Sequence, residues 1–127
     1  SFIGSPAMNL LETDVVDGHA VLGGARIPVP AAHKGRIVVG VRPESWELVG
    51  ESDIEAVELT TELVEELGAE SFAYSVGPAD AGWTARGGRV VVRVDRRVVV
   101  GAGERLRVRP DAGEVYFFDP ESGLRLR

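Results

Sequence analysis

Residues that could carry out chemistry are few in this chain of 127 residues. The two histidines, His19 and His33, each lie in a loop-like stretch without a second ligand type at metal-site spacing. The chain has no cysteine, which excludes disulfides and thiolate metal sites. No serine lies in a Gly-x-Ser-x-Gly motif or beside a base. The carboxylates are spread through strands and turns, as on solvated faces. We therefore expect no catalytic residue, no metal and no bound cofactor in this chain.

One stretch has the glycine spacing of a phosphate-binding loop. In GHAVLGGA, residues 18–25, Gly24 and Ala25 stand where such a loop needs Lys and then Ser or Thr. Because those side chains hold the phosphates and the metal ion, this stretch cannot bind a nucleoside triphosphate. We interpret VVDGHAVLGGARIPVP, residues 15–30, as three strands joined by an Asp-Gly turn and a Gly-Gly turn.

A stripe of arginines is the sharpest surface feature that the sequence predicts. In GERLRVRP, Arg105, Arg107 and Arg109 alternate with Leu106 and Val108, which predicts a strand with its arginines outward. Two interpretations stay open: a solvated face paired with glutamates of a neighbouring strand, or a docking patch for an acidic partner.

The two tryptophans are further candidates for a partner surface. Trp46 and Trp83 are each flanked by loop-like residues. Trp46 fits the core or the lid of a barrel, and Trp83 fits either the core or an exposed contact. The candidate partner surface thus comprises Trp46, Trp83, Arg105, Arg107 and Arg109.

Alternation of apolar and polar residues predicts strands along most of the chain. The clearest stretches are GRIVVGVRP, which Pro43 ends, GGRVVVRVD, EVYFFDP, and the residues that follow the DPESG turn at Gly123, with Leu124 and Leu126 alternating. TTELVEELG, residues 60–68, has helical spacing as well as alternation. We predict a strand there, with a turn or bulge at residues 66–69 and Gly68 at a positive φ.

Size and charge limit the function classes. The length suits one domain with a single core. The formal net charge of −6 argues against a grip on nucleic acid or anionic lipid, whose affinity comes from neutralising phosphate charge. No apolar run approaches the length of a membrane-spanning helix, and no leader pattern indicates secretion.

Four stretches together resemble a known family. These are FIGSPAMNL (2–10), GVRPE (40–44), VEELGAE (64–70) and VYFFDPESGLRL (115–126). They are similar, in order and rough spacing, to the C-terminal region of the ATP-binding subunit of carbohydrate-uptake ABC importers. This group energises the uptake of maltose, trehalose, glycerol-3-phosphate and mixed sugars. Each stretch alone is a weak signal, but the ordered set spans nearly the whole chain.

The resemblance implies an all-β fold, an OB-like β-barrel of the transport-associated (TOBE/MOP-like) type, preceded by a short linker. It implies that residues 1–10 form the junction to a missing N-terminal nucleotide-binding domain and that residues 11–127 form the regulatory barrel. The residues expected to pack on that junction are Phe2, Ile3, Pro6, Met8 and Asn9. Pro43, Gly68 and Gly123 are the expected structural turns.

The resemblance also implies a role. The chain would be the regulatory and dimerisation domain of a bacterial ATP-binding subunit, without ATPase activity of its own, while ATP and magnesium bind the missing domain. The implied partners are a second copy of the subunit, the membrane permease subunits and a cytosolic regulatory protein. The parent would be peripheral, at the cytoplasmic face of the membrane. We expect weak self-association of the isolated barrel, through the Trp46 loop and residues 77–88.

Two other functions stay open at this point. Related transport-associated barrels bind oxyanions, and the arginine stripe together with GARIPVP is compatible with a small-ligand regulatory domain of an importer. Single-stranded nucleic acid is a common ligand of OB folds. The acidic balance and the aromatic content of 6% disfavour that ligand.

Overall fold

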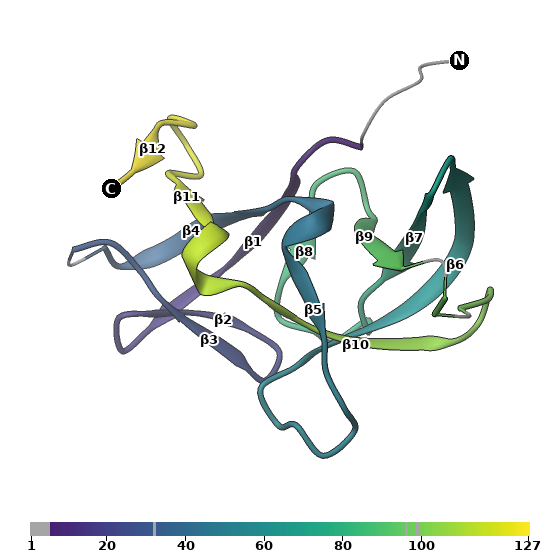
Figure 1. Cartoon of the computed structure of the whole chain (residues 1–127). Helices are drawn as coiled ribbons and strands as arrows, with labels where there is room; N and C mark the ends of the chain where they lie inside the picture. The colour runs from purple at the N-terminus through teal and green to yellow at the C-terminus, as the bar shows by residue number, and fades with distance from the viewer. Residues whose placement is uncertain (1–5, 32, 96, 99) are drawn as a thin grey trace.

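The computed structural model describes residues 6–31, 33–95, 97–98 and 100–127. The described chain folds into strands and two single-turn 3-10 helices (Figure 1). In chain order they are β1 (Asn9–Val16), β2 (His19–Leu22), β3 (Ala25–Pro28), β4 (Gly35–Val41), η1 (Pro43–Ser45), β5 (Trp46–Leu48), β6 (Val57–Leu67), β7 (Glu70–Val76), β8 (Thr84–Ala85), β9 (Val90–Asp95), β10 (Arg105–Pro110), η2 (Ala112–Glu114), β11 (Tyr116–Phe118) and β12 (Arg125–Leu126).

The strands form two antiparallel sheets. The first has the order β12-β11-β4-β1-β2-β3, with β8 paired to β1, and the second has the order β5-β10-β6-β7-β9. In Figure 1 strands β1 to β4 of the first sheet lie beside β6, β7 and β9 of the second. The all-β, OB-like fold predicted from the sequence is confirmed.

The N-terminal strands follow the turn residues predicted from the sequence. β1 and β2 are joined by Asp17 and Gly18, with φ of 50° and 75°. Two central residues of positive φ are what a type I′ hairpin turn requires, and its twist matches that of the flanking strands. Gly23 and Gly24 then join β2 to β3, as predicted.

Residues 60–68, which have helical spacing as well as alternation, form most of strand β6 and the start of its turn. β6 and β7 pair from Thr60–Val76 to Leu67–Glu70, with a bulge between Thr61 and Leu63. Gly68, the first residue of the two-residue turn, has a φ of +63°, as predicted. The bulge bends the long strand β6, so that its first half pairs with β10 and its second half with β7 alone.

The core lies between the sheets and is built by the predicted alternation. Buried side chains facing it include Val90, Val92 and Val94 of β9 and Leu106 and Val108 of β10. β4 is buried on both faces, since Met8 and Phe118 pack over its Gly40. A Cβ added at Gly40 would lie 2.6 Å from Met8 Sδ and 2.9 Å from Phe118 Cε2. Only glycine fits this position without displacing its neighbours.

The ends of the barrel differ in detail from expectation. β1 begins at Asn9, so Asn9 and Leu10 belong to the fold and not to a linker of residues 1–10. Pro43 ends β4 as predicted and opens η1. Gly123 lies in a turn with φ +74°, but Leu124 after it is 70% exposed and does not contribute to the core. The described part of the chain contains no helix of the length and apolarity needed to cross a bilayer.

Candidate functional site

Asn9 joins the first strand to both sheets. Its side-chain Nδ2 donates to the carbonyl oxygens of Val41 (3.0 Å) and Val91 (2.8 Å), and its Oδ1 accepts from the backbone N–H of Val91 (2.8 Å). All hydrogen-bonding groups of this buried amide are therefore satisfied, which makes it a stabilising element between β1, β4 and β9. The predicted junction residues divide accordingly. Pro6 and Met8 are half-buried, and the buried Asn9 side chain is hydrogen-bonded within the barrel. Phe2 and Ile3 lie outside the described residues.

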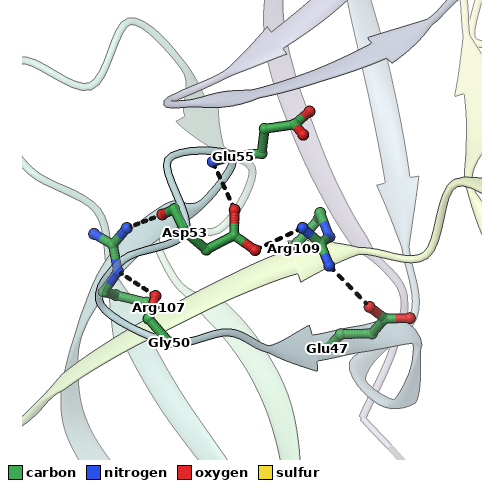
Figure 2. Close-up of polar contacts among 6 residues, drawn as sticks. All are labelled: Glu47, Gly50, Asp53, Glu55, Arg107 and Arg109. Carbon is green, nitrogen blue, oxygen red and sulfur yellow. Dashed lines mark hydrogen bonds and ion pairs between the residues drawn. The ribbon is translucent and has the colours of Figure 1, made fainter.

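Arg107 of β10 holds the segment between β5 and β6, residues 49–56. Its Nε donates to the carbonyl oxygen of Gly50 (3.4 Å), and another guanidinium nitrogen donates to the carbonyl oxygen of Asp53. The third nitrogen pairs with the carboxylate of Glu58 on β6. Figure 2 shows the guanidinium facing Gly50 and Asp53. The Arg107 side chain is only 18% exposed, because the segment covers it.

Arg109 holds the same segment from the next outward position of β10. Its Nη1 donates to Oδ2 of Asp53 at 2.8 Å, and its other terminal nitrogen lies 3.5 Å from a carboxylate oxygen of Glu47 (Figure 2). The free oxygen of Asp53 accepts from the backbone N–H of Glu55 at 2.9 Å, which closes a local turn. Asp53 thus links the arginine to the backbone of the segment.

These contacts decide between the two interpretations of the arginine stripe. Arg107 and Arg109 pair with acidic residues of neighbouring strands and of the 49–56 segment, so the paired-face interpretation is correct for both. Arg105 is exposed, and no described residue pairs with it. Two of the three charges of the stripe are therefore already neutralised, which disfavours a docking patch for an acidic partner along this strand.

Both tryptophans belong to the core, which corrects their place in the candidate partner surface. Trp46 and Trp83 are each 7% exposed and pack within the cluster between the sheets. Trp83 fits because its ring packs on Gly77, where a Cβ would lie 2.5 Å from the ring. Loop-like flanking residues could not reveal this burial, since most residues of the core cluster that contains Trp83 come from other strands.

A shallow pocket of about 310 Å³ lies beside the 49–56 segment. Sequence reasoning did not predict it, nor the role of the segment. It is lined mostly by small and apolar residues from three loops, with the Glu58–Arg107 pair at one side: Gly23, Gly24, Ile54, Ala56, Glu58, Pro78, Ala81, Trp83 and Arg107. A sequence signal did exist: GESDIEA, residues 50–56, places one isoleucine among acidic residues in a loop.

The two histidines contact backbone carbonyl groups. Nδ1 of His19 lies 2.8 Å from the carbonyl oxygen of Asp17, and Nε2 of His33 lies 2.9 Å from that of Arg36. No group of residues that could hold a metal ion occurs within the described chain. Arg107 and Arg109 position the 49–56 segment, and among the residues that line the pocket no nucleophile contacts a base.

The chain is similar to several known proteins. Residues 4–45 match the family model described as the MalK OB fold domain. Over 98% of its length, the chain is 38% identical to the sn-glycerol-3-phosphate import ATP-binding protein UgpC of Cereibacter sphaeroides and covers 34% of that protein. It is 34% identical to the diacetylchitobiose uptake system ATP-binding protein MsiK of Streptomyces coelicolor and covers 38% of it. The resemblance inferred from the sequence is confirmed, and the chain spans about a third of the length of these relatives.

Proposed function

We propose that this chain is the regulatory and dimerisation domain of the ATP-binding subunit of an ABC importer for sugars or for sugar or glycerol phosphates. One observation carries the proposal: nearly the whole chain aligns with about a third of several import ATP-binding proteins, and its beginning matches an OB-fold domain. The names of those relatives include glycerol-3-phosphate import and diacetylchitobiose uptake.

In this proposal the chemistry of ATP belongs to a domain outside the chain. The parent subunit would hydrolyse ATP with magnesium there, since the only phosphate-loop-like stretch here lacks the lysine and the hydroxyl, and it forms the β2–β3 turn. Residues 1–8 would connect the two domains. Met8, packed over Gly40, and Asn9, bonded to both sheets, support a firm attachment of that connection to the barrel.

The proposed partners follow from the role. A second copy of the subunit would meet the barrel, the membrane permease subunits would bind the ATPase domain, and a cytosolic protein would regulate transport. The parent would lie at the cytoplasmic face of the bacterial membrane. Two sheets packed on one core suit a domain that holds a dimer while ATP sites open and close, because a close-packed core keeps its shape.

A domain exchange tests this function. In a Streptomyces coelicolor strain without MsiK, the matching part of that protein is replaced by this chain, and uptake of diacetylchitobiose is measured. We expect the chimera to restore uptake, while the protein truncated before the barrel does not. A chimera that is made in normal amounts and hydrolyses ATP, but supports no more uptake than the truncated protein, would contradict the proposal.

A further inference from the structure

We propose that the 49–56 segment and the pocket beside it form a docking surface for a protein partner that carries an apolar side chain flanked by Arg or Lys. This surface, called here the Ile54 surface, consists of residues 49–56, Pro78, Asp80, Ala81 and the part of the largely buried Trp83 side chain that lines the pocket. The inference does not rest on the proposed transport role, because it follows from this barrel alone.

Ile54 exposes an aliphatic side chain on a segment that is firmly held. Ile54 is 86% exposed, more than any other large hydrophobic residue of the described chain. Its segment projects from the sheets at the bottom of Figure 1. Arg107 and Arg109 hold the backbone on one side, and Gly24 N–H donates to the carbonyl oxygen of Ala56 (2.9 Å) on the other. Because the backbone of the segment is already held, it loses little entropy when a partner covers Ile54.

Ile54 borders a pocket that can receive a side chain of the partner. Ile54, Ala56, Pro78, Ala81 and Trp83 give it a largely apolar wall, and its volume of about 310 Å³ accommodates a large side chain. Apolar pockets next to a projecting aliphatic residue are typical of the centres of interfaces, where a few anchors supply most of the binding energy. The surface therefore both offers an anchor and receives one.

The charge of the surface selects the partner. Glu51, Glu55 and Asp80 are exposed, and no described residue forms an ion pair with any of them. Glu55 and Asp80 adjoin pocket-lining residues along the chain, and Glu51 belongs to the same segment as Ile54. The two nearby arginines of β10 are already neutralised by Glu58, Asp53 and Glu47. The rim is thus acidic, and a complementary partner is basic around its apolar residue.

The same charges disfavour two other occupants. A second copy, meeting this surface about a two-fold axis, would bring the acidic rims together. An anionic membrane would be repelled by them. A basic protein segment is the occupant that satisfies both the apolar centre and the acidic rim.

The test selects short random peptides displayed on phage against the 127-residue chain. Peptides kept by the wild type are then measured against Ile54→Asp, against Glu51→Lys/Glu55→Lys, and against the matched controls Leu124→Asp and Glu121→Lys. Leu124 is also an exposed aliphatic residue, at 70%, but lies far along the chain in the C-terminal turn. Far-ultraviolet circular dichroism checks that each variant is folded.

We expect the selected peptides to share an aliphatic or aromatic residue flanked by Arg or Lys. Ile54→Asp should weaken their binding about tenfold or more, as for a central anchor. The double lysine variant should weaken it several-fold and reduce its salt dependence, while both controls bind like the wild type.

Several results would overturn the proposal. These are the absence of any wild-type-specific peptide family, a consensus rich in Asp or Glu, and equal binding to wild type and Ile54→Asp. Two further results would assign the surface to another occupant. One is flotation with phosphatidylcholine–phosphatidylglycerol vesicles that depends on Ile54, and the other is a dimer in sedimentation that Ile54→Asp abolishes. Neither result bears on the domain exchange, whose readout is uptake.

Discussion

Two connections of the five-stranded sheet are held in opposite ways. The β6–β7 connection is a two-residue turn, and its shape depends on Gly68 at a positive φ. The β5–β6 connection, residues 49–56, is longer and is held by Arg107 and Arg109, which lie more than fifty residues later in the chain. The first is stabilised by local backbone chemistry, and the second by side chains of a distant strand.

The difference shows how each connection can fail. A turn that depends on one φ angle is sensitive to a single residue and to nothing far away. A segment held by distant side chains keeps its shape only while the barrel brings β10 beside it. It can therefore be loosened without changing any residue of the segment. The following substitutions test this contrast, from the largest expected effect to the smallest.

Gly24→Ala should have the largest effect, because it pushes the 49–56 segment off its support. A Cβ at Gly24 would overlap the backbone carbonyl oxygen of Ile54, which cannot rotate away. We expect a loss of about 3 kcal/mol in the free energy of unfolding, the upper range for overpacking, measured by urea denaturation. Gly50→Ala is the control, since a Cβ there has open space within the same segment. Equal midpoints for both variants would show that the segment moves freely.

Arg107→Met should have the next largest effect. It keeps an apolar stem but removes the donors to the carbonyl oxygens of Gly50 and Asp53 and the ion pair with Glu58. We expect a loss of about 2 kcal/mol, in the range for hydrogen bonds to charged groups. Hydrogen exchange should also become faster at the Glu55 amide. Arg105→Met, at an exposed position, should change stability by less than about 0.5 kcal/mol. Similar losses for both arginines would contradict the special role of Arg107.

Gly68→Ala should have a smaller effect, confined to the β6–β7 turn. A Cβ there meets no atom within 4 Å, so its cost comes from the φ of +63° alone. We expect a loss of about 1 kcal/mol, with binding at the Ile54 surface unchanged. Gly68→Asn is the matched variant, since Asn tolerates this region better and should lose less. An unchanged denaturation midpoint for Gly68→Ala would mean that the turn is not limited by its backbone angle.

The smallest effect should come from Asp95, whose carboxylate bonds Arg97, and it should depend on pH. Hydrogen bonds from the Arg97 side chain, and then from its backbone N–H, lower the pKa of Asp95 from 3.8 to about 2. A lowered pKa in the folded state means that ionised Asp95 stabilises the fold above pH 4 and that this contribution is lost as the pH falls toward 2. Asp95→Asn should therefore be slightly less stable than the wild type at pH 5, and the difference should close near pH 2.

The control for this pH dependence is Asp80→Asn, because the Asp80 carboxylate makes no hydrogen bond or ion pair with any described residue. Its difference from the wild type should stay near zero at both pH values. If the difference in stability between Asp95→Asn and the wild type instead grew as the pH fell, ionised Asp95 would not be the form that stabilises the fold.

The same contrast explains what could be predicted from the sequence. The Asp17–Gly18 turn, the Gly68 turn and the alternating strand β10 depend on neighbours along the chain, so their residue types were sufficient to predict them. The contacts of Arg107 depend on a strand and a loop that meet only in the folded barrel. Trp83 appeared loop-like for the same reason, since only the fold places it against Gly77 and the core.

The candidate site was predicted in part. The arginines were predicted to lie on an outward face, and pairing with glutamates of a neighbouring strand was one of the two interpretations left open. The fold places Asp53, Glu58 and Glu47 against Arg107 and Arg109, which neutralises two of the three charges of the stripe. Ile54, with its acidic neighbours, remains exposed. It was not predicted, because no local sequence pattern specifies that its side chain is exposed.

Asn9 has a mechanical consequence. β1 and β9 share no backbone ladder in the described chain, and the Asn9 amide connects them by bonding Val91 while it also bonds Val41. A tension applied to the residues before β1 therefore reaches this one amide before it reaches most of the β1–β4 ladder. It is divided there between the two sheets. The barrel would respond to such a pull as one body and not by peeling strand from strand, with Asn9 as the point where the force enters.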